Sequence, residues 1–158
     1  MGHKTVKKIS FTFLLVLIFF SCESKHYYQE NQDLSAGWAK DSIKEFSFHV
    51  KDSVDIHANL AFLLRNKTDY AYSNLYLFTT IKDPKGHEMT DTLQYYIANP
   101  DGSWIGKGIQ AKEQLLILRE NLPLKDTGVY KIQVKQGMRT NVLKGLKDIS
   151  LIVDKTNN

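Results

Sequence analysis

Apolar residues recur at every second position along most of this chain, which is the period of a β-strand and not of a helix. The clearest run covers residues 54–64, where six apolar residues at alternate positions lie on one face of a single strand. The same alternation recurs in five further segments: 46–50, 75–79, 93–97, 130–134 and 149–153. Turn-forming residues separate these segments. About seven or eight short strands at this spacing predict an all-β fold, a single antiparallel β-sandwich of immunoglobulin-like or jelly-roll-like type.

The segment 1–21 departs from this pattern and has the three parts of a bacterial export signal. Lys4, Lys7 and Lys8 form a basic start, an apolar stretch covers 9–20, and the small residue Ser21 follows. The apolar stretch is shorter than the roughly 20 residues of a comfortable transmembrane helix. We therefore interpret residues 1–21 as a cleaved lipoprotein signal peptide.

Cys22 is the only cysteine of the chain and stands directly after this segment. The block Phe19-Phe20-Ser21-Cys22 resembles a lipobox, in which the cysteine sulfur is diacylated and the cysteine becomes the first residue after cleavage. The usual lipobox has Leu where Phe19 stands, and an ordinary secretory signal or an uncleaved anchor are the alternatives. Acyl chains on Cys22 would hold the protein on a membrane, because each buried methylene contributes about 0.8 kcal/mol.

Two parts follow the signal peptide. Residues 22–35 are polar and lack apolar periodicity, which predicts a flexible tether, and residues 36–155 are expected to form one β-sandwich domain. Cleavage leaves 18 basic against 17 acidic side chains. The basic balance of the full chain therefore belongs largely to the signal peptide and does not indicate nucleic-acid binding.

A short motif before the segment 130–134 supports the sandwich. Asp126-Thr127-Gly128-Val129-Tyr130 resembles the tyrosine corner of immunoglobulin-like domains, in which the Tyr hydroxyl bonds to the backbone just upstream. An ordinary loop leading into a strand explains the same residues equally well. In either case Tyr130 is expected to be structural.

The residues that could carry chemistry do not form a catalytic or metal-binding pattern. His49, His57 and His87 lack the spacing of a metal motif, and no serine sits in a nucleophile elbow. The segment 102–108 superficially resembles a phosphate-binding loop, but it is one residue short and lacks the Ser or Thr after Lys107 that would hold magnesium. We therefore expect no catalytic residue, no metal, no cofactor and no small-molecule substrate.

Aromatic residues concentrate in the segment 70–78 and at Trp104. Aromatic side chains at loop tips can anchor a protein interface, whereas at strand ends they usually cap the core. Both interpretations stay open.

Several blocks of the chain occur together in one known family. They are Gly37-Trp38-Ala39-Lys40-Asp41, Leu64-Arg65-Asn66, 70–77, Asp91-Thr92-Leu93, 102–108, Gly128-Val129-Tyr130 and Gln136-Gly137-Met138-Arg139. In this order they resemble the GldH-type gliding-motility lipoproteins of Bacteroidetes, over nearly the whole chain and including the signal peptide. The loop around Trp104 and the Met138-Arg139 pair are the more specific part of the resemblance.

The resemblance implies an outer-membrane lipoprotein that faces the periplasm and is needed for gliding along surfaces. It would act with other Gld lipoproteins and be linked to the type IX secretion system. The family has no established catalytic residues, so the resemblance adds none. It implies a non-catalytic component that assembles or stabilises the motility machinery.

Four residues within the family-like blocks are candidates for binding a partner protein: Trp104, Arg65, Tyr72 and Arg139. Aromatic and arginine side chains are the residues that most often dominate protein interfaces. The alternative is that both arginines make structural hydrogen bonds to carbonyl groups at strand ends.

A competing function is a surface-exposed carbohydrate-binding lipoprotein, because exposed aromatic side chains of small sandwiches often stack on sugar rings. Surface display in this phylum is commonly signalled by several acidic residues just after the lipid-bearing cysteine. Glu23 is the only acidic residue in the stretch Glu23-Ser24-Lys25-His26. This weakens the competing function without removing it.

Overall fold

The computed structural model describes residues 26–51 and 56–156, which form ten β-strands. The strands are β1 (Tyr28–Asp33), β2 (Trp38–Ala39), β3 (Lys44–Val50), β4 (Ile56–Asn66), β5 (Asn74–Lys82), β6 (Glu88–Tyr96), β7 (Lys112–Leu124), β8 (Gly128–Gln136), β9 (Val142–Leu143) and β10 (Leu146–Thr156). Within these residues, no helix has the length and apolar character needed to cross a membrane.

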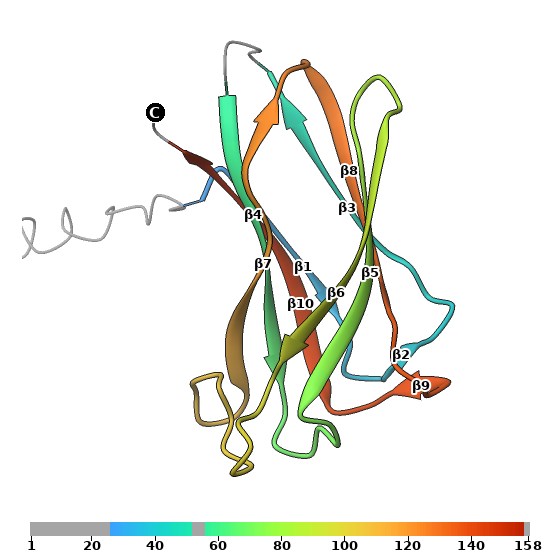
Figure 1. The fold of residues 1–158 in the computed structure, drawn as a ribbon, viewed down its shortest axis with the longest axis vertical. Helices are drawn as coiled ribbons and strands as arrows, with labels where there is room; N and C mark the ends of the chain where they lie inside the picture. Colours follow the sequence, from blue (N-terminus) through green and yellow to red (C-terminus); the bar gives the residue numbers. More distant parts are fainter. Residues whose placement is uncertain (1–25, 52–55, 157–158) are drawn as a thin grey trace, which may run out of the picture.

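The strands form two four-stranded antiparallel sheets that pack face to face (Figure 1). Sheet I has the strand order β1-β10-β4-β7, and sheet II has the order β3-β8-β5-β6. Strands β2 and β9 form a separate two-stranded pair at one end of the sandwich. This arrangement confirms the predicted all-β antiparallel sandwich.

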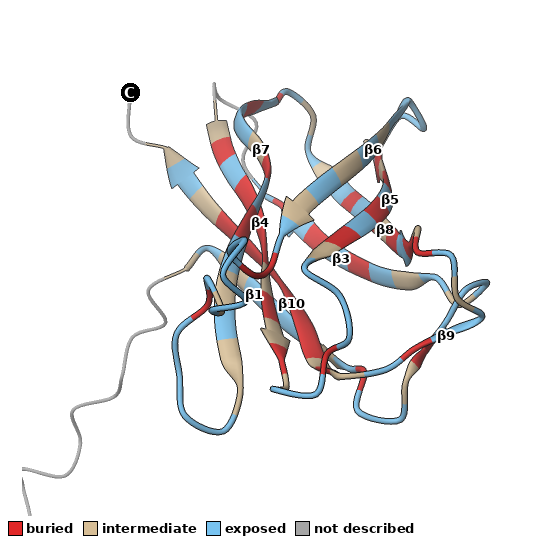
Figure 2. Cartoon of the chain, turned by 60° about the horizontal axis from the view of Figure 1, so that its bottom comes forward, coloured by how far each residue is buried: buried red, intermediate tan, exposed pale blue. Residues whose placement is uncertain are grey.

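The alternating sequence pattern places one side of each strand between the two sheets. In β4, Leu60, Phe62 and Leu64 are fully buried, and the ring of Phe62 lies 6.1 Å from the ring of Phe46 in sheet II. Figure 2 shows the resulting bands of buried and exposed residues along the strands. Burial of a Leu or Phe side chain contributes about 1.5–3 kcal/mol, so this layer holds the two sheets together.

The expected flexible tether is wrong between Tyr28 and Asp33, because these residues form β1. This strand pairs with β10 along its whole length, from Tyr28 opposite Val153 to Asp33 opposite Asp148. It is an edge strand, and its mostly polar residues are exposed or half-buried. It therefore lacks the apolar alternation that reveals the other strands. The fold begins before the predicted boundary at residue 36, and residues 22–25 lie outside the described residues.

The first described residue, His26, is already attached to the sandwich. Its Nδ1 atom lies 2.7 Å from Oδ1 of Asp154 in β10. The ring of Tyr28 lies 5.7 Å from the ring of Phe48 in sheet II. Residues 23–25 are all that separate Cys22 from His26 in the sequence.

Side chains close one open side of the sandwich, where the edge strands β1 and β3 face each other. The Tyr27 hydroxyl donates to the carbonyl oxygen of His49 at 3.1 Å, and the Gln32 side-chain amide donates to the carbonyl oxygen of Glu45 at 2.5 Å. These bonds occupy backbone acceptors that an added strand would need.

The other open side, between β6 and β7, is closed in the same way. The Tyr95 hydroxyl donates to the carbonyl oxygen of Ile117 at 2.6 Å, and the Gln114 side-chain amide donates to the carbonyl oxygen of Tyr96 at 3.0 Å. An ion pair between Arg119 and Asp91 completes this seam. A partner is therefore expected to bind a face or an end of the sandwich and not to extend a sheet.

The tyrosine-corner interpretation is confirmed. The Tyr130 hydroxyl accepts a hydrogen bond of 3.2 Å from the backbone N–H of Asp126. The Tyr130 ring is buried and stacks on Phe48 with ring centroids 5.5 Å apart. Tyr130 fixes the entry into β8 and is structural, as predicted.

Candidate functional site

Loops from both sheets gather where β4, β6 and β8 finish, at the lower end of Figure 1. We call this region the loop end, and it comprises residues 67–73, 97–111 and 137–145. The predicted partner-binding residues lie in the loop end or at its margin. Tyr72, Trp104 and Arg139 lie within the loops, and Arg65 is the second-last residue of β4.

Backbone hydrogen bonds join the loops of the loop end to one another. The carbonyl oxygen of Ser73 accepts bonds from the N–H groups of Ile97 (2.8 Å) and Ala98 (3.1 Å), and the N–H of Lys67 donates to the carbonyl oxygen of Gly145 at 2.8 Å. These bonds link the three loops of the loop end to one another.

Gly145 allows the turn between β9 and β10 to approach Tyr70 closely. Its φ of +82° lies in the left-handed region, and a Cβ at this position would lie 2.5 Å from Cα of Tyr70. Tyr70 is buried, and its hydroxyl donates to the carbonyl oxygen of Asn74 at 2.9 Å. Burial raises the pKa of the Tyr70 hydroxyl. Tyr70 therefore caps the core, as one of the two aromatic interpretations expected.

Arg65 binds a carboxylate and not the strand-end carbonyl groups of the structural alternative. Its Nε and NH2 atoms donate to the two carboxylate oxygens of Asp148 in β10, at 2.7 and 2.5 Å. This hydrogen bonding raises the pKa of the Arg65 guanidinium. The two-point geometry engages the charge of Arg65 within the domain.

Trp104 is half-buried and packs against the hydrophobic core. It forms an isolated bridge with Ala98, and the N–H of the next residue, Ile105, donates to the carbonyl oxygen of Ile97 at 3.0 Å. Part of the side chain therefore supports the loop, and part stays accessible to a partner.

Tyr72 and Arg139 are the more accessible candidates. The Tyr72 side chain is 39% exposed, and its ring stands edge-on to Tyr70 at 5.8 Å. Arg139 is exposed, and its guanidinium forms no hydrogen bond or ion pair to any of the residues that the structure describes. Both could contact a partner without breaking an internal bond found here.

Gly106 allows the segment 102–108 to approach β7 closely. Lys107 and Glu113 exchange backbone hydrogen bonds of 3.0 and 2.8 Å. A Cβ on Gly106 would lie 3.0 Å from the carbonyl oxygen of Glu113. Packing against β7 therefore accounts for Gly106, and positive φ values of +83° and +132° account for Gly102 and Gly108.

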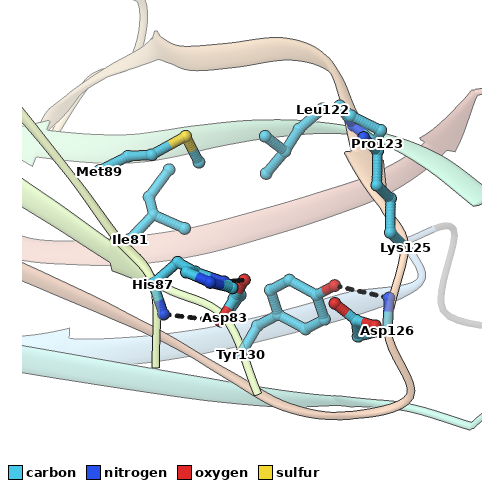
Figure 3. Close-up of a pocket in the computed structure, with 9 residues that line it drawn as sticks. All are labelled: Ile81, Asp83, His87, Met89, Leu122, Pro123, Lys125, Asp126 and Tyr130. Carbon is cyan, nitrogen blue, oxygen red and sulfur yellow. Dashed lines mark hydrogen bonds and ion pairs between the residues drawn. The ribbon is translucent and has the colours of Figure 1, made fainter. Parts of the chain in front are cut away.

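A small pocket of about 130 Å³ lies at the opposite end, between the β5–β6 turn and the β7–β8 turn (Figure 3). Its walls include Ile81, Met89 and Leu122. At its rim, Nδ1 of His87 lies 2.7 Å from a carboxylate oxygen of Asp83. The other carboxylate oxygen of Asp83 accepts backbone N–H groups of the same turn, so this pair shapes the hairpin.

Across residues 26–51 and 56–156, His, Cys, Asp and Glu side chains form no group of three that could hold a metal ion. The histidines that the sequence analysis considered are separated: His49 lies near the end of β3, His57 near the start of β4, and His87 in the β5–β6 turn.

The outward face of sheet II carries an aromatic patch that the sequence analysis did not assign to a site. Tyr76 and Phe78 are 36% and 42% exposed. Phe78 and Lys135 line a shallow hollow of about 190 Å³, and the Lys135 ammonium lies 5.7 Å from the ring centroid of Phe78. The sequence feature that could have revealed this patch is the presence of apolar residues on both faces of β5, with Tyr76 and Phe78 on the face opposite Leu75 and Leu77.

These features define a small antiparallel β-sandwich whose candidate binding surfaces are a packed loop end and exposed apolar strand positions. The chain belongs to the GldH lipoprotein family, which matches residues 26–153. This confirms the resemblance found in the sequence.

Two relatives are similar over nearly their whole length. The gliding motility lipoprotein GldH homolog of Christiangramia forsetii is 36% identical over 157 residues, which cover 94% of this chain and 96% of that protein. The gliding motility lipoprotein GldH of Flavobacterium johnsoniae is 32% identical over 158 residues, which cover 95% and 98%. The chain is therefore a lipoprotein of the gliding-motility type.

Among solved structures, one of infectious bursal disease virus (Gt strain) is 10% identical with a TM-score of 0.37, over 81% of this chain and 30% of that chain. This likeness is too distant to bear on function.

Proposed function

We propose that this protein is anchored by lipid on Cys22 to the outer membrane, faces the periplasm, and acts as a non-catalytic assembly component of the gliding machinery. Its partners are other gliding-motility lipoproteins, and its action is linked to type IX secretion. The observation that carries the proposal is the family match over residues 26–153, together with relatives named as gliding motility lipoproteins.

The N-terminal sequence supports the anchor. A basic start, a short apolar stretch and Ser21 precede the only cysteine of the chain, which is the arrangement of a lipid-modified export signal. Several acyl chains on one residue give stable membrane attachment, whereas one chain is marginal.

The loop end supports a binding role. It offers Tyr72 and Arg139 at the surface and Trp104 at the edge of the core, all on loops held together by backbone bonds. Aromatic side chains lose little conformational entropy on binding, and aromatic and arginine side chains often dominate interface energies. We propose that this end binds the partner lipoprotein.

The test is to purify the tagged, lipidated protein from detergent-solubilised outer membranes after light crosslinking and to identify the proteins that accompany it. Enrichment of gliding-motility lipoproteins or type IX secretion components over a Cys22→Ala control supports the proposal. Recovery of the protein by itself, or with polysaccharide-uptake proteins, contradicts it.

Variants at the loop end then locate the partner surface. Arg139→Ala is the sharpest, because the exposed guanidinium makes no bond within the described part of the chain, so the fold should be unaffected. Lys125→Ala at the opposite end is the matched control, since it removes an exposed cation of similar size. Partner capture should fall for Arg139→Ala and persist for Lys125→Ala; equal capture by both would place the interface elsewhere.

Trp104→Ala addresses the second candidate residue. A folded variant that captures less partner supports an interface role, and a variant with a strongly lowered unfolding midpoint shows that Trp104 serves the core.

A surface-displayed carbohydrate-binding lipoprotein is the second candidate function. The observation in its favour is the exposed pair Tyr76 and Phe78 beside the hollow on sheet II, because aromatic faces stack on sugar rings. Protease treatment of intact cells separates the candidates: a periplasm-facing protein stays intact, and a surface-displayed one is degraded.

A further inference from the structure

The outward face of sheet I carries apolar side chains that do not belong to the core. In β10, Ile149, Leu151 and Val153 point into the core, so the alternate residues point outward. Strand register aligns the outward positions in two rows: Gln29, Ile152, Ala61 and Ile117, then Asn31, Ser150, Leu63 and Leu115.

Five members of these rows form one contiguous apolar area, which we call the outer patch: Ala61, Leu63, Leu115, Ile117 and Ile152. Leu115 and Ile117 are 50% and 45% exposed, Leu63 is half-buried, and Ala61 and Ile152, at 6% each, lie buried beside them. Contiguous exposed apolar side chains on a small domain mark an interaction surface more often than scattered ones do. Removing such side chains from water is favourable.

His26, the first described residue, lies beside the same face. Asp154 occupies the outward position next after Ile152 in β10, and its carboxylate holds the ring of His26 at 2.7 Å. Cys22 lies four positions before His26. A fully extended chain of this length spans at most about 14 Å, which is about three strand spacings of a sheet.

We infer that the outward face of sheet I lies against the membrane that the Cys22 lipid enters, with the outer patch in contact with the lipid surface. This rests on the lipid anchor of the proposed function. The long flexible tether expected from the sequence would leave the orientation of the domain free. Because the fold already begins at His26, the short link to Cys22 restricts the orientation of the domain relative to the membrane.

The side chains near His26 suit the polar zone of a bilayer. The ammonium of Lys155 lies 4.4 Å from the ring centroid of Tyr27, and tyrosine and lysine are residues that favour membrane interfaces. In the next outward row of sheet I, Arg65 and Asp148 neutralise each other, and Asp33 and Glu113 complete the row. These two further carboxylates are costly to desolvate, so this row lies at the aqueous edge of the contact and the outer patch carries the contact with lipid.

The same orientation turns the outward face of sheet II away from the membrane, since the two sheets of a sandwich stack about 10 Å apart. Phe78 and Tyr76 then face the aqueous side, where a soluble partner can reach them. The loop end lies to one side and is accessible to a partner anchored in the same membrane.

Labelling of single introduced cysteines tests this orientation, because Cys22 is the only native cysteine and its sulfur is acylated in the lipidated protein. Nitroxide labels at Leu115→Cys and Phe78→Cys form a matched pair: both side chains are apolar, on strands, and exposed to a similar extent, 50% and 42%. A third label at Lys85→Cys reports on the end that carries the β5–β6 turn.

The lipidated variants are placed in vesicles of phosphatidylethanolamine and phosphatidylglycerol, and the accessibility of each label to oxygen and to a water-soluble nickel chelate is measured. We expect the oxygen-to-nickel accessibility ratio at Leu115→Cys to rise on vesicle binding relative to the soluble Cys22→Ala form. The ratio at Phe78→Cys should not change. Ile117→Cys is the replacement if circular dichroism shows that Leu115→Cys is unfolded.

Three results overturn the inference. Equal ratios at both faces show a freely tumbling domain, and the highest ratio at Lys85→Cys shows that the domain stands on that end. Spin–spin broadening at Leu115→Cys without vesicles shows that a second copy covers the outer patch. Failure of the lipidated protein to float with vesicles instead refutes the lipid anchor itself, and the orientation falls with it.

Discussion

Arg65 in β4 and Asp148 in β10 form a two-point ion pair across neighbouring strands, with donor–acceptor distances of 2.7 and 2.5 Å. The Asp148 side chain is only 7% exposed, whereas that of Arg65 is 36% exposed. The carboxylate therefore depends on the guanidinium for its hydrogen bonds, and the pair joins the two central strands of sheet I near the loop end.

Arg65→Ala should lower the free energy of unfolding by about 3 kcal/mol, because it leaves the buried Asp148 carboxylate without its partner. Arg139→Ala is the matched control and should change it by less than about 0.5 kcal/mol. Urea denaturation at neutral pH measures both. Similar stability of the two variants would show that water satisfies Asp148 and that the pair contributes little.

Most strands of this fold could be predicted from the sequence because they have one buried and one exposed face. In β3 the pattern of exposed and buried residues alternates from Glu45 to Val50, and a period of two survives in any such strand. β1 escaped prediction because both of its faces are largely polar and exposed. Its pairing depends on β10, more than 100 positions later in the chain.

The candidate site was only partly predictable for the same reason. The resemblance to the family selects Tyr72, Trp104 and Arg139, and their gathering at one end follows from the strand order. The ion-pair partner of Arg65 could not be predicted, because Asp148 is 83 positions away and no local pattern specifies such a contact. The outer patch needed the register of β4 and β7, which the sequence pattern leaves open.

A soluble chain that begins at Ala36, the boundary expected from the sequence, should be less stable than one that begins at His26. It lacks β1, so it exposes the β10 edge and removes Tyr28 from its packing against Phe48. Loss of one partly buried aromatic residue and a six-residue strand should lower the melting temperature and promote association through the open edge.

The comparison uses thermal unfolding followed by circular dichroism, with size-exclusion chromatography as the measure of association. The two chains differ only in residues 26–35. If they melt at the same temperature and both stay monomeric, β1 adds nothing to the domain, and the segment behaves as the tether that its composition suggested.

Gly145→Ala should be strongly destabilising, by about 2–5 kcal/mol. The residue has a φ of +82°, and the new Cβ would lie 2.5 Å from Cα and 2.8 Å from N of Tyr70, so backbone has to move. Gly86→Ala is a control for the conformational part, because Gly86 has a similar φ of +90° with its nearest neighbour atom at 4.0 Å. That variant should lose about 1–2 kcal/mol.

Chemical denaturation of the two variants separates backbone strain from steric overlap. A much larger loss for Gly145→Ala locates the loop-end contact at Tyr70 as a stability determinant. Equal losses would mean that the β9–β10 turn shifts freely away from Tyr70, and the loop end would then be less rigid than its hydrogen bonds indicate.

Tyr95 should make the stability of the protein sensitive to alkaline pH. Burial, followed by the charge of Asp91, raises the pKa of Tyr95 to about 12 in the folded state, from a usual value of 10.0. Below pH 10 the hydroxyl is protonated in both states. Between the two pKa values the unfolded chain releases this proton while the folded chain keeps it, so the free energy of unfolding falls as pH rises through this window.

Tyr95→Phe removes this dependence along with the hydrogen bond of 2.6 Å to the carbonyl oxygen of Ile117. At pH 8 the variant should lose about 1 kcal/mol, whereas Tyr96→Phe, whose side chain is 65% exposed, should lose less. Between pH 10 and 12 the stability of Tyr95→Phe should fall less steeply than that of the unaltered protein. Parallel profiles in guanidinium titrations across this range would show that the Tyr95 hydroxyl is open to water and that the β6–β7 seam does not enclose it.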